Sequence, residues 1–109
     1  MVRIISMDDF RRGRTVRFEG RGYGCSVSFF VVDAREGNGP DLHTHPYEET
    51  FVITDGGATF TVDGEEIEAS AGTIIVVPPN TPHAFKAGSD GMRSVNIHGA
   101  DRMEQTDLE

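Results

Sequence analysis

The sequence predicts an all-β protein, and three observations lead to this prediction. Short apolar runs recur between turn signals, as in proteins built from many short strands. Helical periodicity is scarce along the chain. Asp63-Gly64 lies between two such runs and is a hairpin signal, because both positions accept a positive φ. At 109 residues the chain suffices for one hydrophobic core and is too short for two ordinary domains, so we expect residues 1–109 to form a single domain.

The apolar runs place the expected strands in order along the chain. They cover residues 15–18, 25–32, 50–54, 58–62, 65–68, 74–77, 82–85 and 94–98. Within the run 58–62, alternation of Ala58, Phe60 and Val62 with threonines predicts a half-buried sheet. The string VPPNTP, residues 77–82, cannot continue a central strand because each proline removes a donor from the ladder. We therefore expect it to be the loop that delivers His83.

Three histidines and a glutamate have the spacing of a metal site. His43 and His45 are two residues apart, Glu49 follows, and His83 comes much later. Alternate residues of a strand point to the same face, so a strand carrying His43 and His45 aims both imidazoles into one interior. Imidazole suits zinc, copper, iron and nickel, and a carboxylate extends the range towards manganese. The set therefore predicts a site for a divalent transition metal.

The neighbouring carboxylate Glu48 competes with Glu49 for the inward position. Glu49 shares its face of the expected strand with Phe51 and Ile53, which are apolar. Glu49 is therefore expected to point inward and Glu48 to be solvated.

Two segments resemble the two sequence motifs of the cupin superfamily. Residues 37–56, GNGPDLHTHPYEETFVITDG, match the first motif without a gap: glycine, five residues, His-x-His, three residues, glutamate, six residues, glycine. Residues 72–85, GTIIVVPPNTPHAF, resemble the second motif. They depart from it at Asn80, where a glycine is usual, and at Ala87, two residues after the segment, where some members of the superfamily have an asparagine. Asparagine tolerates the left-handed conformation, so Asn80 can serve the turn.

The resemblance implies a double-stranded β-helix (jelly-roll) barrel and a metal held by His43, His45, Glu49 and His83. The ion would be Fe, Mn, Ni or Zn, and its identity stays open. Four protein ligands on a metal that accepts six leave positions open for water, substrate or dioxygen. Some cupins have lost the metal and keep its residues as a scaffold, which is the alternative.

Similar sites in the cupin superfamily support dioxygenases, decarboxylases, isomerases and lyases. We expect a metal-dependent enzyme acting on a small molecule, with oxidoreductase chemistry of the dioxygenase type. The alternatives are a non-catalytic binding module for a sugar or small metabolite, and a metal-dependent isomerase or lyase. No helix-turn-helix or other effector domain is recognisable, which favours the enzyme. A seed-storage role is excluded by size, because such proteins carry two cupin domains.

A titratable group beside the open metal positions would distinguish an enzyme from a binder. His98 and Asn96 share one face of the last expected strand and are the candidates, with His98 as the catalytic residue. A surface histidine at a strand end is the alternative for His98. The aromatic residues that either line a pocket or fill the core are Tyr23, Tyr47, Phe51 and Phe85.

The net charge of −8 is unevenly distributed. Six arginines against three acidic residues give the first 21 positions a charge of +3, and the remainder carries −11. A basic arm can contact nucleic acid, but the sequence pI near 4.8 argues against this and favours a solvated edge or a subunit interface. Small cupins resemble one another in pairing barrels by sheet extension, so we expect a homodimer to which residues 1–20 contribute.

The compartment is expected to be the cytoplasm. No apolar stretch is long enough to span a membrane, and the N-terminus, MVRIISMDDF, lacks the apolar core of a signal peptide. Cys25 is the only cysteine, which excludes an internal disulfide and fits a reducing compartment. Its place in an expected strand predicts a buried, unreactive thiol. Leu108-Glu109 resembles the junction left by a purification tag.

Overall fold

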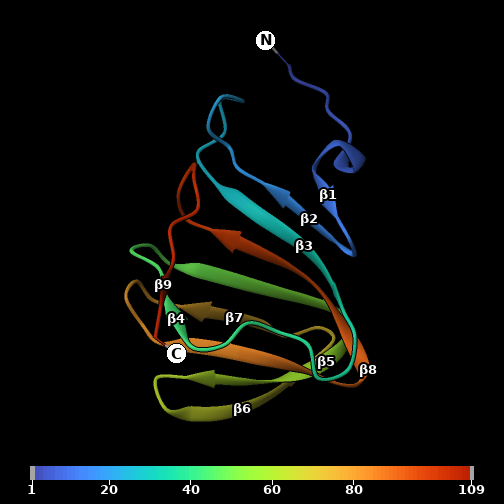
Figure 1. The fold of residues 1–109 in the computed structure, drawn as a ribbon, viewed down its shortest axis with the longest axis vertical. Coiled ribbons are helices and arrows are strands. Elements are labelled where there is room, and N and C mark those ends of the chain that lie inside the picture. The colour runs from blue at the N-terminus through green and yellow to red at the C-terminus, as the bar shows by residue number, and fades with distance from the viewer. Residues whose placement is uncertain (1, 109) are drawn as a thin grey trace.

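The computed structural model describes residues 2–108 and confirms the all-β prediction. A single turn of 3-10 helix, η1 (Met7–Phe10), comes first. The strands follow in the order β1 (Arg11–Arg12), β2 (Thr15–Phe18), β3 (Ser28–Ala34), β4 (His43–Thr44), β5 (Glu49–Val62), β6 (Glu65–Ser70), β7 (Ile74–Val77), β8 (His83–His98) and β9 (Thr106–Asp107). Figure 1 shows the N-terminal elements at one end of the molecule and β6 at the other.

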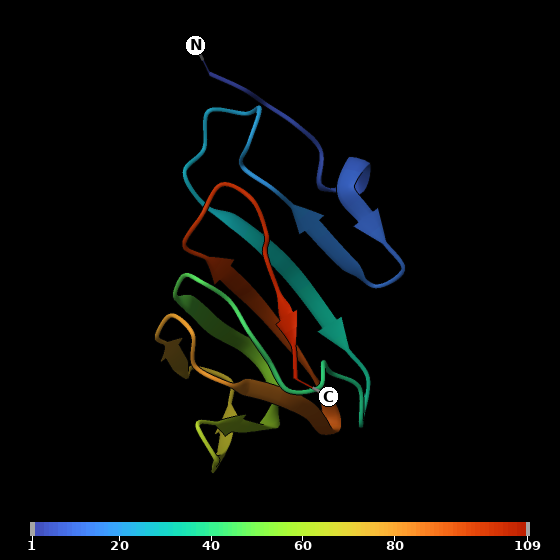
Figure 2. The same cartoon turned by 60° about the vertical axis from the view of Figure 1, so that its left-hand side comes forward.

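The two longest strands, β5 and β8, build the barrel. They pair antiparallel along most of their length, with register shifts at Ile53/Asp55 and Gly56/Ala58 that bend the pair. The first half of β5 lies between β7 and the second half of β8, and β3, β2 and β1 continue that layer. The second half of β5 lies between β6 and the first half of β8, which continues to β4 and β9. Figure 2 shows these layers from the side.

The sequence interpretation divided each long strand in two, and the structure corrects this. Residues 50–54 and 58–62 belong to one strand, β5, and residues 83–85 and 94–98 belong to another, β8, which begins one residue after Pro82. Glycines are typical of turns, but the glycines between these segments allow the bent strands β5 and β8 to approach each other closely. A Cβ on Gly56, which has φ +65°, would collide with the carbonyl oxygen of Gly91. The glycines therefore sit at the bulge and not at a chain reversal.

The structure also tests the predictions for individual turns and strands. Asp63 and Gly64 have φ of 50° and 83°, which confirms the hairpin between β5 and β6, and Asn80 adopts φ 59° in the proline-rich loop. The strand expected at 25–32 instead spans Ser28–Ala34, so Cys25 lies in the preceding loop and is half-buried. The short elements η1, β1 and β9 were not predicted, because segments of two to four residues carry too little periodicity. The strand expected to carry His43 and His45 is β4, which ends at Thr44, one residue before His45.

One hydrophobic cluster joins the two halves of the barrel. Phe51 and Ile53 from the first half of β5 pack with Phe60 from its second half, and Val77 and Met92 complete the deepest part. Phe51 and Phe60 meet edge to face with ring centroids 5.0 Å apart. Glu49 precedes these residues on the same face of β5, so the cluster forms the floor beneath the polar site described below.

Within residues 2–108, no helix has both the length and the apolar character needed to cross a bilayer.

Candidate metal centre

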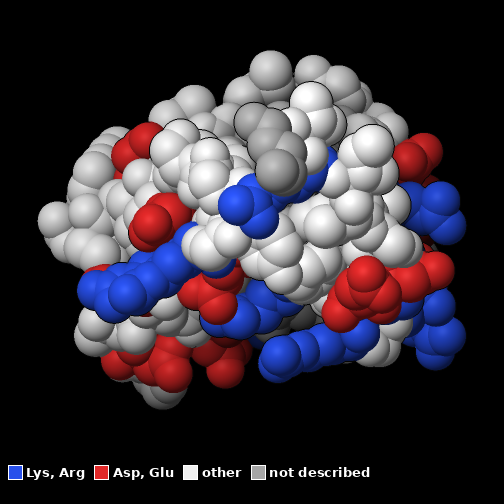
Figure 3. All heavy atoms as spheres, turned by 90° about the horizontal axis from the view of Figure 1, so that it is seen from above, with Lys and Arg blue, Asp and Glu red and all other residues white. Residues whose placement is uncertain are grey.

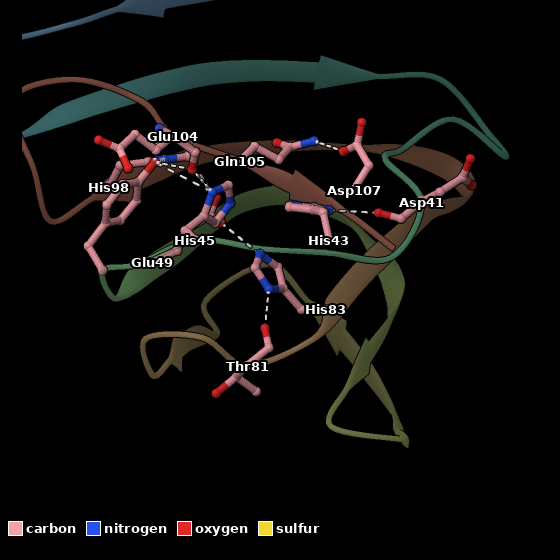
Figure 4. A network of polar contacts seen from close by, with 11 residues as sticks. Asp41, His43, His45, Glu49, Thr81, His83, His98, Glu104, Gln105 and Asp107 are labelled. Carbon is pink, nitrogen blue, oxygen red and sulfur yellow. Dashed lines mark hydrogen bonds and ion pairs between the residues drawn. The ribbon is translucent and has the colours of Figure 1, made fainter. Parts of the chain in front are cut away.

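Strand pairing brings the four predicted ligands together. His43 of β4 pairs in register with His83, the first residue of β8, and Glu49, the first residue of β5, pairs with His98, the last residue of β8. His45 follows directly after β4. All four predicted ligands are buried, and one ligand atom from each lies within 4.8 Å of the others (Figure 4). Glu48 is exposed and Glu49 is buried, so Glu49 is the carboxylate that points inward, as expected.

Each of the three histidines is oriented by a backbone carbonyl. The Nδ1–H of His43 donates to the oxygen of Asp41 over 2.6 Å, that of His45 to Glu104 over 2.7 Å, and that of His83 to Thr81 over 2.8 Å. A carbonyl oxygen can only accept, so Nδ1 carries the proton in all three rings. In the neutral imidazole this leaves Nε2 as the atom with a free lone pair, turned towards the interior.

The carboxylate of Glu49 meets these nitrogens at short distances. Its Oε1 lies 3.0 Å from His83 Nε2 and 3.1 Å from His45 Nε2. Oxygen and nitrogen lone pairs that face one another at this distance repel, so either protons or a cation must lie between them. Among the described residues, His45 Nε2 is a buried nitrogen without a hydrogen-bond partner. The donor set and its unpartnered nitrogen are compatible with a divalent metal ion.

The electrostatics of the site favour an ionised Glu49. Burial is the largest single effect and raises its pKa, but the contacts from His45, His83 and His98 together outweigh it and lower the pKa well below the usual range. The pKa of His45 is raised: desolvation opposes this, but the Glu49 carboxylate and the Glu104 carbonyl outweigh it. The pKa of His43 is lowered, chiefly because its burial disfavours the charged ring.

His98 lies in the same cluster and not on the surface. It is 2% exposed, and its Nε2 is 3.2 Å from Glu49 Oε2 without the alignment of a hydrogen bond. Its Nδ1 lies 2.6 Å from the hydroxyl of Tyr47. The strand-end surface position considered for His98 is therefore wrong, because Glu49 and His98 are cross-strand partners on the interior face.

Tyr47 connects the histidines to the C-terminal segment, residues 99–108. Its ring stacks on that of His45 at 5.1 Å and 8°. Its hydroxyl accepts from the backbone N–H of Glu104 over 3.1 Å and lies 3.2 Å from the Glu104 carbonyl oxygen. Burial raises the pKa of Tyr47, which keeps the hydroxyl protonated. Tyr47 is thus buried among polar groups, whereas Tyr23 packs on Phe18 in a separate aromatic group.

The C-terminal segment forms one wall of the site. Strand β9 pairs with β4, beside which it lies in Figure 1, so the segment returns beside His43. The N–H of Met103 donates to Glu19 Oε2 over 2.8 Å, and this bond is the main reason why the pKa of Glu19 is lowered. Sequence reasoning missed the segment and the carbonyls of Asp41, Thr81 and Glu104, because backbone groups have no sequence signature.

A pocket of about 300 Å³ opens beside the cluster. His43, His45, Glu49, Asn96 and His98 contribute to its polar part. Asn96 is buried and points inward, as expected, and its Oδ1 accepts a hydrogen bond from the Ser94 hydroxyl over 2.7 Å. The apolar part is formed by Phe30, Val32, Ala34, Pro40, Phe51 and Phe85. Phe51 and Phe85 therefore both line the pocket and belong to the core.

Comparison with known proteins agrees with this architecture. A family model described as a cupin domain matches residues 29–97. Quercetin 2,3-dioxygenase of Bacillus subtilis (strain 168) is 35% identical over 72 residues, which are 62% of this chain and 21% of that protein. The chain therefore spans about a fifth of the length of this curated relative.

Solved structures show the same fold at low sequence identity. Oxalate decarboxylase from Bacillus subtilis has a TM-score of 0.83 at 17% identity, over 95% of this chain and 31% of that chain. An uncharacterized protein with a double-stranded β-helix domain from Klebsiella pneumoniae subsp. pneumoniae MGH 78578 has a TM-score of 0.74 at 22% identity, over 95% of this chain and 89% of that chain. These likenesses confirm the predicted double-stranded β-helix.

Proposed function

Because the chain belongs to the cupin domain family, we propose that it binds one divalent transition metal ion through His43, His45, Glu49 and His83. The observation that carries the proposal is the convergence of two Nε2 atoms on Glu49 Oε1 while every Nδ1–H is already donated to a carbonyl. A cation between these atoms turns the repulsion into attraction. Iron, manganese, nickel and zinc all suit three imidazoles and one carboxylate.

The reaction proposed for this site is an oxidation of a small molecule of the dioxygenase type. When bound, a redox-active ion supplies Lewis acidity and a place where an oxidisable substrate and dioxygen meet. The distant relative quercetin 2,3-dioxygenase supports this chemistry over the decarboxylase reaction, because its likeness extends to sequence and not to fold alone. Metal-dependent isomerase or lyase chemistry is the runner-up, since the same donor set serves it.

Within this proposal the metal ligands, His98 and Tyr47 have separate tasks. Glu49 compensates one of the two charges of the ion, and the three carbonyl-bound histidines hold their rings in place. His98 lines the pocket, and its buried Nε2 lacks a hydrogen-bond partner among the described residues. It is proposed to hold or transfer a proton at Nε2, while the Tyr47 hydroxyl fixes the ring at Nδ1.

The alternative function is a binding module for a sugar or small metabolite, and a proton-transfer role for His98 would distinguish the enzyme from such a binder. A pure binder needs no titratable group beside the metal ligands, whereas an enzyme that moves protons does. The test is oxygen uptake by the iron-loaded protein with a panel of 1,3-diketones and 3-hydroxy ketones. We expect uptake with at least one of them, and we expect His98→Ala to keep its iron and lose rate. If a compound binds tightly but the iron, manganese, nickel and zinc forms neither consume oxygen nor convert that compound, the enzyme proposal is wrong and the protein is a binding module.

A homodimer in the cytoplasm completes the proposal. The exposed apolar residues Val2, Ile4 and Met7 precede the first strand, and the edge strand β7, which pairs with β5 alone, exposes Ile74 and Val76. In the view onto the N-terminal end, uncharged atoms fill most of the upper half, a basic side chain lies near the centre, and most other charged side chains lie in the lower half and at the sides (Figure 3). A second copy that covers these residues would protect the exposed edge by extending the sheet.

A further inference from the structure

We infer that the pocket beside the metal ligands takes a flat, largely apolar ligand with a single negative charge, such as an enolate or a 3-hydroxy-ketonate, and discriminates against dianionic acids. This inference rests on the proposed metal site. The inference goes beyond the proposed metal site by assigning the charge and shape of the substrate, which the metal ligands alone do not specify.

Within residues 2–108, the pocket wall contains no side chain with a permanent positive charge. Among the described residues that line the pocket, none is lysine or arginine. Its ionisable groups are Glu49 and the histidines, and its other polar members are uncharged residues such as Asn38, Asn96 and Gln105. A ligand in the pocket therefore meets no lysine or arginine side chain among the described residues of the wall itself.

Lys86 and Arg14, which are adjacent in sequence to the lining residues Phe85 and Thr15, are already committed to other partners. The ammonium of Lys86 donates to the Gly39 carbonyl over 2.6 Å and to Asp41 over 3.1 Å, and its side chain is 49% exposed. The guanidinium of Arg14, next to the lining residue Thr15, pairs with Asp33 over 2.9 Å. Neither of these cations is free to turn towards a ligand without breaking an existing contact.

The net charge of the metal-loaded site favours a ligand with one negative charge. A divalent ion held by neutral imidazoles and the ionised Glu49 leaves a net charge of +1. A ligand with one negative charge neutralises it. A dianion would leave one negative charge between aromatic and aliphatic side chains with no partner, and burying an unpaired charge is costly. The pocket is therefore complementary to a monoanion.

The apolar wall of the pocket favours a flat ligand. Aromatic rings from three different strands line the pocket: Phe30 from β3, Phe51 from β5 and Phe85 from β8. Val32 and Pro40 add aliphatic surface. Aromatic rings gain most from contact with another flat unsaturated body, and about 300 Å³ is at the lower end of the range for small-molecule sites. A compact conjugated ligand fits these properties.

The experiment is a binding comparison on the zinc-loaded full chain, because zinc removes any turnover. Isothermal titration calorimetry would compare tropolone, a flat ring with one charge shared by two oxygens, with the dianions oxalate and phthalate. Phthalate is a flat ring of similar size and isolates the effect of charge. Each affinity is divided by the affinity of that probe for free zinc, and zinc content is measured after the titration. We expect tropolone to exceed both dianions by at least about tenfold on this scale.

Two variants then test the cause. Asn38→Arg places a cation at an exposed lining residue and should raise the relative affinity for phthalate by about tenfold. Ile74→Arg adds the same charge on β7, where the side chain is 66% exposed and outside the pocket, and should leave it unchanged.

If the protein binds zinc but its relative affinity for the dianions equals or exceeds that for tropolone, the inference is overturned and the proposed metal site stands. Failure to bind zinc overturns the proposed function and this inference with it.

Discussion

The hydroxyl of Tyr47 should stabilise the fold, because it is the hydrogen-bonding partner of a buried histidine. Tyr47→Phe removes the oxygen that lies 2.6 Å from His98 Nδ1 and keeps the ring that stacks on His45. His98 is 2% exposed, so its Nδ1 would lose its partner without access to water. The cost of one such buried polar atom is about 1–3 kcal/mol. The N–H of Glu104 also loses its acceptor, but Glu104 is exposed and water can replace the hydroxyl.

We therefore expect Tyr47→Phe to lower the free energy of unfolding of the metal-free protein by about 2 kcal/mol. The assay is urea denaturation near neutral pH with a chelator present, analysed by linear extrapolation. The matched control is Tyr23→Phe, since the Tyr23 hydroxyl has no hydrogen bond within residues 2–108 and its ring packs on Phe10 and Phe18. The control should change stability by less than about 0.5 kcal/mol.

A double-mutant cycle isolates the contact itself. In the His98→Ala background, Tyr47→Phe should cost at least about 1 kcal/mol less than in the wild type, because the orphaned nitrogen is absent. Equal losses in Tyr47→Phe and Tyr23→Phe, or no coupling in the cycle, would refute the reasoning that the hydroxyl holds His98.

Three further predictions concern metal, charge and assembly. Because the pKa of His45 is raised, its ring takes up a proton at a higher pH than an ordinary imidazole, so metal affinity measured by competition with a chelator should begin to fall above about pH 6.5 as the pH is lowered; a flat profile from pH 8 to pH 5 contradicts this. Glu49→Gln keeps an oxygen ligand and loses its charge, so zinc affinity should fall by at least about tenfold in calorimetry, while the exposed control Glu48→Gln should match the wild type; equal losses would mean that the ligand assignment is wrong. Deleting residues 1–7 removes the exposed apolar N-terminal residues and should convert the proposed dimer into a monomer in sedimentation at tens of micromolar; a monomeric wild type rejects the dimer, and a dimeric deletion variant rejects only this route.

The parts of the site that sequence predicted are those with a local signature. The His-x-His pair, the alternation of Glu49 with Phe51 and the Asp63-Gly64 turn each depend on a few neighbouring residues, and all three have the expected arrangement. The backbone preferences and the two-residue period of a strand are enough to specify them.

The parts that sequence missed depend on residues far apart in the chain. The pairing of Glu49 with His98 follows from the register of two bent strands, and the bends come from shifts in the ladder that glycine content alone does not distinguish from turns. The acceptor for His45 Nδ1 is a carbonyl of Glu104, and any residue type provides a carbonyl. Tyr47 is adjacent to the motif, but its role depends on where the C-terminal segment returns.

The metal content of the purified protein tests the central claim most directly. Protein prepared without added metal would be analysed by mass spectrometry of its elements, alongside His45→Ala, His83→Ala and His98→Ala. We predict about one equivalent of a divalent transition metal in the wild type and in His98→Ala, and less than about a tenth of that in the other two variants. A full equivalent in His45→Ala or His83→Ala, or a wild type that binds no divalent metal even when iron, manganese, nickel and zinc are supplied, would contradict the assignment of these residues as ligands.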